Sequence, residues 1–157
     1  MAIVGRVRPE YYGNPAGVTE DVDVVRAIYA AFAARDLEAG LAHVAPDCEI
    51  VVEGTARRAG RSGPYRGHEG LRDYFADVER TWDDLTLHAD DFRALPGTVV
   101  VMGHVHGRRA EEEVRRKVLW TWRLRDGLAV AVRVSDLGPA PEPGASAAAG
   151  PGTPDVP

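Results

Sequence analysis

Asp136 is the residue best placed for chemistry, because it continues a series of apolar side chains along one expected strand. Leu128, Val130, Val132 and Val134 stand two apart before it, and successive strand side chains point to opposite faces. The carboxylate should therefore share a face with the valines. At a pocket edge, desolvation would raise its pKa and suit it to general acid or base catalysis. The alternative is a solvated aspartate at a strand end, or one that caps a nearby backbone N–H.

The strand that ends in Asp136 pairs with the strand before it through Asp126-Gly127, a dipeptide typical of tight β-hairpin turns. One face of that earlier strand carries Val118, Trp120, Trp122 and Leu124. The hairpin of residues 114–136 therefore aims one carboxylate at a wall of tryptophan and valine side chains.

Aromatic and valine side chains are candidates to line a pocket for a flat ring system. The predicted ligand-binding residues are Tyr29, Phe32, Val52, Tyr65, Tyr74, Trp82, Val101, Trp120, Trp122, Val132 and Val134. Tyr65 follows Gly60 and Gly63 in an expected loop, where an aromatic side chain could gate a pocket mouth. The same side chains could instead simply fill the core, because aromatic side chains at the spacing of buried positions usually pack there.

His104 and His106 stand two apart on an expected strand and so share a face. With His88 and a neighbouring aspartate they could form a metal site. The alternating valines of residues 99–105 are expected on the concave face, however, which places both histidines outside. A polar outer face or a subunit contact is the simpler interpretation, and we expect neither a metal nor another cofactor.

Bulk properties narrow the possible partners. The chain has 157 residues and a net charge of −5, which favours one domain and argues against nucleic acid as a partner. Glu111, Glu112 and Glu113 interrupt the one basic cluster, residues 108–117. Cys48 is the only cysteine, and no apolar run approaches the roughly 20 residues of a membrane span. We expect a cytoplasmic protein that does not bind membranes.

The elements that must position these residues follow from hydrophobic periodicity. A helix from a Thr19 N-cap, a short helix from an Asp36 N-cap and a third around residues 71–82 are expected. Pro46 should end the second helix. Residues 48–53 are expected as a strand, 54–67 as a loop, and 85–95, 98–106 and 114–136 as a strand meander. This order predicts an α+β domain in which helices cover one face of a curved antiparallel sheet and leave an apolar hollow.

The two ends of the chain are expected to differ from this domain of residues 19–137. Residues 1–18 are predicted to form an irregular lead. Residues 138–157 hold six prolines, four glycines and five alanines, which predicts a disordered tail with little to bury.

Five motifs in order resemble the nuclear transport factor 2-like (cystatin-like) fold, and within it the SnoaL-like polyketide cyclase group. The matching stretches are Asp36–Ala39, Ala45–Glu49, Tyr65–Phe75, Trp82–Asp84 and Trp122–Gly127. The resemblance implies a cone-shaped sheet wrapped on about three helices. It also implies a cyclase or isomerase that uses acid–base chemistry without a cofactor on an apolar or aromatic, polyketide-like molecule. A non-catalytic ligand-binding or dimerisation domain is the alternative, and the family's curved sheets favour a homodimer.

The resemblance can be followed residue by residue. Ketosteroid isomerase, of the same superfamily, needs a tyrosine on its first helix and two acids, and the aligned positions here hold Ile28, Val52 and Trp120. Tyr29 and Glu53 each lie one place away from such positions. The isomerase mechanism is therefore not expected in that form, and this loss favours the non-catalytic alternative. The ending Asp136-Leu137-Gly138 is similar to that of the polyketide cyclases, which implies a catalytic role for Asp136.

Overall fold

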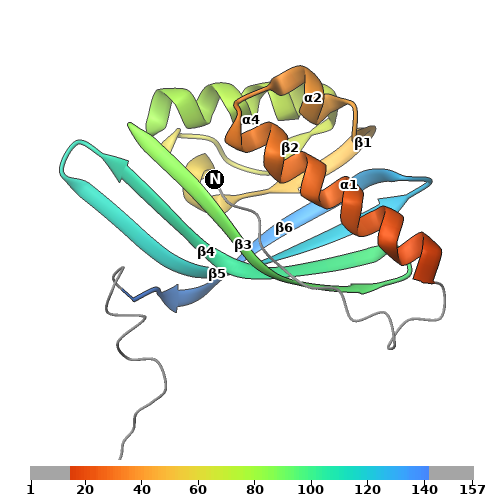
Figure 1. Cartoon of the computed structure of the whole chain (residues 1–157). Helices are drawn as coiled ribbons and strands as arrows, with labels where there is room; N and C mark the ends of the chain where they lie inside the picture. Colours follow the sequence, from red (N-terminus) through yellow and green to blue (C-terminus); the bar gives the residue numbers. More distant parts are fainter. Residues whose placement is uncertain (1–14, 142–157) are drawn as a thin grey trace, which may run out of the picture.

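The computed structural model describes residues 15–141, so most of the expected lead and tail lies outside the described residues. The helices are α1 (Pro15–Ala33), α2 (Leu37–Leu41), α3 (Glu53–Arg58) and α4 (Gly67–Thr81). The strands are β1 (Val44–Val51), β2 (Tyr65–Arg66), β3 (Asp84–Leu95), β4 (Thr98–Arg109), β5 (Glu112–Arg125) and β6 (Leu128–Pro139). The helices gather on one face of a curved six-stranded sheet, which confirms the α+β prediction (Figure 1).

The sheet has the order β2-β1-β6-β5-β4-β3. Strands β3 to β6 form an antiparallel meander, whereas β1 runs parallel to β6 and antiparallel to β2. Figure 1 shows the long strands curving beneath α1 and α4, so the concave face and the helices enclose the interior.

Helix α1 buries the predicted stripe, in which Val25, Tyr29 and Phe32 are each at most 5% exposed. Its predicted start at Thr19 is wrong, because the helix begins at Pro15. A proline lacks an amide hydrogen, and the first helical turn does not need one. The last residues of the expected irregular lead are therefore helical.

Helix α2 begins as predicted, because the Asp36 side chain accepts a hydrogen bond from the Ala39 amide at 3.1 Å. Pro46 does not end this helix. It lies inside β1, where the pairing with β6 shifts register between Val44 and Glu49. Such an irregularity frees a strand position from the need for an amide donor.

Residues 54–67, expected as a loop, instead contain most of helix α3 and the two-residue strand β2. Both elements are too short to show a hydrophobic period. Helix α4 follows as predicted and buries Leu71, Tyr74 and Val78.

The central hairpin is confirmed, and both turn residues have positive φ, 56° for Asp126 and 77° for Gly127. On β5 the predicted face is buried throughout. On β6 the simple alternation is wrong, because Ala129 is fully buried whereas Leu128 and Val130 are half-buried. A register shift opposite Arg123 and Leu124 inserts an extra residue and exchanges the faces. Beyond it, Val132 and Val134 face inward as expected.

Within residues 15–141, no helix has the length and apolar character needed to cross a membrane.

Candidate ligand-binding site

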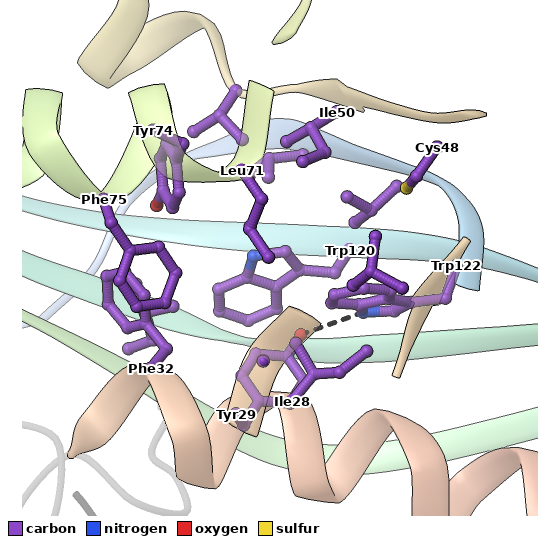
Figure 2. Close-up of a pocket in the computed structure, with 16 residues that line it drawn as sticks. Ile28, Tyr29, Phe32, Cys48, Ile50, Leu71, Tyr74, Phe75, Trp120 and Trp122 are labelled. Carbon is purple, nitrogen blue, oxygen red and sulfur yellow. Dashed lines mark hydrogen bonds between the residues drawn. The ribbon is translucent and has the colours of Figure 1, made fainter. Parts of the chain in front are cut away.

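An apolar cavity of about 70 Å³ lies between α1, α4 and the inner face of the sheet (Figure 2). Eight of the eleven predicted ligand-binding residues line it: Tyr29, Phe32, Val52, Tyr74, Trp120, Trp122, Val132 and Val134. They come from the first helix, the fourth helix and strands far apart in sequence. Among the described residues that line this inner cavity, none carries a formal charge.

Several residues of the inner cavity were missed from the sequence. Leu71 and Phe75 belong to the apolar stripe of α4, so the same periodicity that predicted the helix could have found them. Cys48 and Ile50 alternate along β1, where a short and irregular strand gave a weaker signal. Leu87 lies on β3 and required the sheet order to place it.

The polar side-chain groups among the residues that line the cavity are two tyrosine hydroxyls, two indole N–H groups and one thiol, from Tyr29, Tyr74, Trp120, Trp122 and Cys48. The Trp122 Nε1–H donates a hydrogen bond to the Tyr29 hydroxyl oxygen at 3.2 Å (Figure 2). Burial raises the pKa of Tyr29 well above its ordinary value, and burial also raises the pKa of Tyr74. Both phenols therefore stay protonated and neutral at physiological pH.

Cys48 lines the same cavity and is 1% exposed. Burial, with smaller contributions from Asp47 and Glu49, raises the pKa of its thiol to about 12. The side chain therefore acts as a small apolar group, because the thiolate is the reactive form.

A second, larger cavity of about 550 Å³ adjoins the first and contains charged side chains. Five residues line both cavities: Val52, Tyr74, Leu87, Trp120 and Val134. The outer cavity adds Trp82, Asp136 and the arginines Arg57, Arg58, Arg115 and Arg116. The site therefore has an apolar inner part and a charged outer part that share one boundary.

Asp136 lies in the wall of the outer cavity, on the inner face as predicted, opposite Val118 on β5. Arg116 donates hydrogen bonds to both carboxylate oxygens, at 2.9–3.1 Å, and the Gly138 amide donates a further one at 2.8 Å. The Arg116 hydrogen bonds, above all, hold the pKa of Asp136 below its ordinary value. The expected rise in pKa is therefore wrong, because the side chain is exposed and paired rather than desolvated. A catalytic role for Asp136 stays a prediction.

Three other predicted ligand-binding residues do not line the inner cavity. Tyr65 is buried in β2, where its hydroxyl donates to Asp77 at 2.8 Å, so its position does not fit a mobile gate. Val101 is fully buried in the core. Trp82 lines the outer cavity and donates to the Thr55 hydroxyl at 3.1 Å.

The three histidines of strands β3 and β4 lie on the outer face of the sheet. His88 and His104 pair across β3 and β4 with their rings stacked 4.2 Å apart, and His106 contacts Glu113 at 2.7 Å. Burial and the neighbouring His104 lower the pKa of His88. No group of three potential metal ligands occurs within residues 15–141.

A curved sheet closed by helices around an apolar hollow defines the nuclear transport factor 2-like class of proteins, and solved structures of that class align with this chain. The family model of the SnoaL-like domain matches residues 25–132. The chain therefore belongs to the SnoaL-like domain family.

Three solved structures illustrate the likeness. TerC, co-crystallised with polyporic acid, is 27% identical over 74% of this chain and 91% of its own, with a TM-score of 0.67. A nuclear transport factor 2-like protein of unknown function from Burkholderia pseudomallei is 25% identical over 74% and 90%, with a TM-score of 0.68. IdmH of Streptomyces antibioticus, a candidate polyketide cyclase, is 23% identical over 74% and 91%, with a TM-score of 0.61. Among curated proteins, none matches the sequence significantly.

Proposed function

We propose that this protein binds a small, largely apolar molecule, with one end in the inner cavity and the remainder in the outer cavity. The observation that carries this proposal is the uncharged, aromatic-lined inner cavity of about 70 Å³. An engineered apolar cavity of about 150 Å³ holds benzene, so the inner cavity here accommodates only part of a ring system. The five shared boundary residues allow a longer ligand to extend outward. The co-crystallisation of TerC with polyporic acid supports a small-molecule site in this fold.

Val134 tests this proposal because it lies at the boundary of the two cavities and is only partly buried. We expect Val134→Phe to weaken the binding of aromatic compounds by about tenfold or more, since the larger ring would fill the boundary space. Isothermal titration calorimetry with a panel of two- and three-ring aromatics, polyporic acid included, measures the effect. Ser135→Phe is the matched control, because Ser135 is the next residue on β6 and faces the opposite side. Equal affinities for the two variants would argue against this site.

A second candidate function is acid–base catalysis of the cyclase or isomerase type, favoured by the position of Asp136. Its lowered pKa makes the carboxylate a base rather than an acid near neutral pH. In the proposed step, an Asp136 oxygen takes a proton from a carbon next to a carbonyl, and the electron pair moves onto the carbonyl oxygen. Arg116 and Arg57, both in the wall of the outer cavity, supply positive charge near that oxyanion.

The proton-transfer step can be followed with 5-nitrobenzisoxazole, whose ring opens when a carbon-bound proton is removed. We expect Asp136→Asn to lower the protein-dependent rate by at least tenfold, because the amide cannot accept the proton. Since the pKa of Asp136 is lowered, the wild-type rate should stay constant down to about pH 4 and fall below it. Asp47→Asn, a change of an exposed aspartate outside both cavities, is the control. If Asp136→Asn catalyses the reaction at the wild-type rate, Asp136 is not the catalytic base.

We also propose that the protein pairs through the outer face of its sheet. Met102, 44% exposed on β4, lies beside Leu119 of β5 on that face, and Val100 stands two residues away. We expect wild type to sediment as a dimer of about 34 kDa, twice the chain mass of 17.0 kDa. Met102→Lys should shift the equilibrium to monomer, because two lysines would meet near the symmetry axis. A wild-type protein that sediments as a monomer would contradict the proposal.

A further inference from the structure

The wall of the outer cavity contains one arginine that has no acidic partner among residues 15–141. Four arginines and three acids of the described chain line this cavity. Three of the arginines form ion pairs at 2.7–2.9 Å: Arg58 with Glu112, Arg115 with Glu113, and Arg116 with Asp136. The fourth is Arg57, whose exposed side chain forms neither an ion pair nor a hydrogen bond with any residue of 15–141.

Glu53 is the acid nearest to Arg57 along the chain, and it also lines the outer cavity. Both residues belong to α3 and lie four residues apart, a spacing at which opposite charges can pair across one helical turn. No ion pair joins them. The five N–H donors of the Arg57 guanidinium are therefore available to a ligand.

The positive charge of Arg57 acts inside the outer cavity. Hydrogen bonds from Arg116 chiefly lower the pKa of Asp136, and the charge of Arg57 adds to this effect. Arg57 is therefore close enough to the wall formed by β6 to attract a negative group of a ligand. Asp136 opposes that attraction only weakly, because its own charge is paired with Arg116.

A carboxylate fits one unpaired arginine better than a phosphate does. The planar guanidinium matches the two oxygens of a carboxylate, and such charge-assisted hydrogen bonds are roughly twice as strong as neutral ones. A phosphate dianion would need a second cation, but the other three arginines of the wall are already paired with acids. The inner cavity, whose described lining is uncharged and aromatic, suits the opposite end of such a molecule.

We propose that the ligand is an amphipathic carboxylate, with an apolar ring in the inner cavity and its carboxylate bound by Arg57 in the outer cavity. This inference rests on the proposed binding function and names the ligand class of that site. Val52 connects the two parts, because it lines both cavities and directly precedes α3. A ligand chain that passes Val52 therefore leads toward the helix that carries Arg57.

Phenylalkanoates and their primary amides test the proposal, because the two members of each pair share a shape and differ in charge. Isothermal titration calorimetry at pH 7 compares 3-phenylpropanoate, 4-phenylbutanoate and 5-phenylpentanoate with the matching amides. In the pair that differs most, we expect wild type to bind the carboxylate about 5- to 10-fold more tightly, as one charge-assisted contact at a partly exposed site implies. Arg57→Gln should abolish this preference and leave the affinity for the amide within about twofold.

Matched variants separate a local contact from the charge of the whole protein. Arg72→Gln removes the same charge from an exposed arginine of α4 that lines neither cavity and has no ion pair within residues 15–141. It should leave the preference for the carboxylate unchanged. Glu53→Gln should instead strengthen carboxylate binding by about twofold, because it removes a negative charge one helical turn from Arg57.

Two further measurements distinguish charge recognition from damage to the fold. Sodium chloride at about 0.5 M should weaken binding of the carboxylate more than binding of the amide, because salt screens exposed charges. Arg57→Gln should unfold at nearly the same temperature as wild type, because the Arg57 side chain forms no hydrogen bond or ion pair with residues 15–141.

The outcomes distinguish this proposal from the binding function on which it rests. If wild type binds the carboxylates and amides equally, or if Arg72→Gln lowers carboxylate affinity as much as Arg57→Gln does, the carboxylate proposal is overturned and the binding function stands. If neither these compounds nor the larger aromatics bind wild type, the binding function itself is overturned. A loss of carboxylate preference that is confined to Arg57→Gln supports both.

Discussion

Replacement of Gly103 by alanine is expected to lower the free energy of unfolding by about 3 kcal/mol or more, one of the largest single effects in this chain. A Cβ added at this position would overlap the backbone carbonyl oxygen of His88 and lie 3.2 Å from Trp120 Cζ3. Gly103 pairs with Ala89 beside the register shift between β3 and β4. Neither the strand backbone nor the buried indole can move away without the loss of pairing or packing.

Urea denaturation followed by circular dichroism measures this effect. Gly54→Ala is the matched control, because the nearest atom to its added Cβ is 3.8 Å away and the residue lies in α3. That variant should keep or raise stability, by up to about 1 kcal/mol, since alanine favours a helix over glycine. Similar stabilities for Gly103→Ala and Gly54→Ala would show that the His88 carbonyl oxygen does not lie close enough to Gly103 to exclude a Cβ.

The Gly103 variant should also disturb the ligand site. Trp120 lines both cavities, so a shift of its ring changes the boundary between them. We expect the aromatic compounds that bind wild type to bind this variant more weakly, even at temperatures where it remains folded.

Asp77→Asn is expected to lower the free energy of unfolding by about 2–4 kcal/mol, because it removes the charge from a buried hydrogen-bonded cluster. Asp77 is 2% exposed, and its carboxylate accepts hydrogen bonds from Arg61 at 2.7 Å, from Tyr65 at 2.8 Å and from Arg80. These bonds join the segment after α3, strand β2 and helix α4. Asparagine offers one oxygen in place of two and no charge for the two guanidinium groups.

The same cluster predicts a pH dependence. Burial acts to raise the pKa of Asp77, but hydrogen bonds from Arg61 and Tyr65 outweigh it and hold the pKa below its ordinary value. A carboxyl group with a lowered folded-state pKa stabilises the protein above its unfolded-state pKa of about 3.9, and this contribution is lost as the pH falls further. The stability difference between wild type and Asp77→Asn should therefore be constant near neutral pH and shrink below about pH 4.

Urea denaturation across pH 3–7 measures both the loss of stability in Asp77→Asn and its dependence on pH. Asp73→Asn is the control, because its side chain is 47% exposed and lies 3.8 Å from Arg61. That change should alter stability by less than about 1 kcal/mol, as is usual for exposed ion pairs. A stability difference for Asp77→Asn that grows as the pH falls would contradict the sign derived from the lowered pKa.

Local sequence patterns were sufficient for much of the fold. The alternation of Val118, Trp120, Trp122 and Leu124 identified a strand face that the structure buries, and Asp126-Gly127 identified its turn. The Asp36 cap and the apolar stripe of α4 were equally local. These signals depend on the periodicity of strands and helices and on the residue types that favour turns. Both are determined by residues close together in the sequence.

Short or irregular elements were not predictable in the same way. Helix α3 and strand β2 are too brief to show a period, and the bulge in β6 arises only when that strand pairs with β5. One inserted residue exchanges the faces of a strand, so Ala129 rather than Val130 entered the core. A pattern read along one strand contains no information about such a shift.

By itself, then, the sequence determined the class of fold, the two tryptophans of the cavity wall and the side of the sheet on which Asp136 lies. Only the tertiary structure decided the electrostatic state of each polar group, because that state depends on partners distant in the chain. Arg116 stands 20 residues from Asp136, and Trp122 stands 93 residues from Tyr29. Packing brought these groups together.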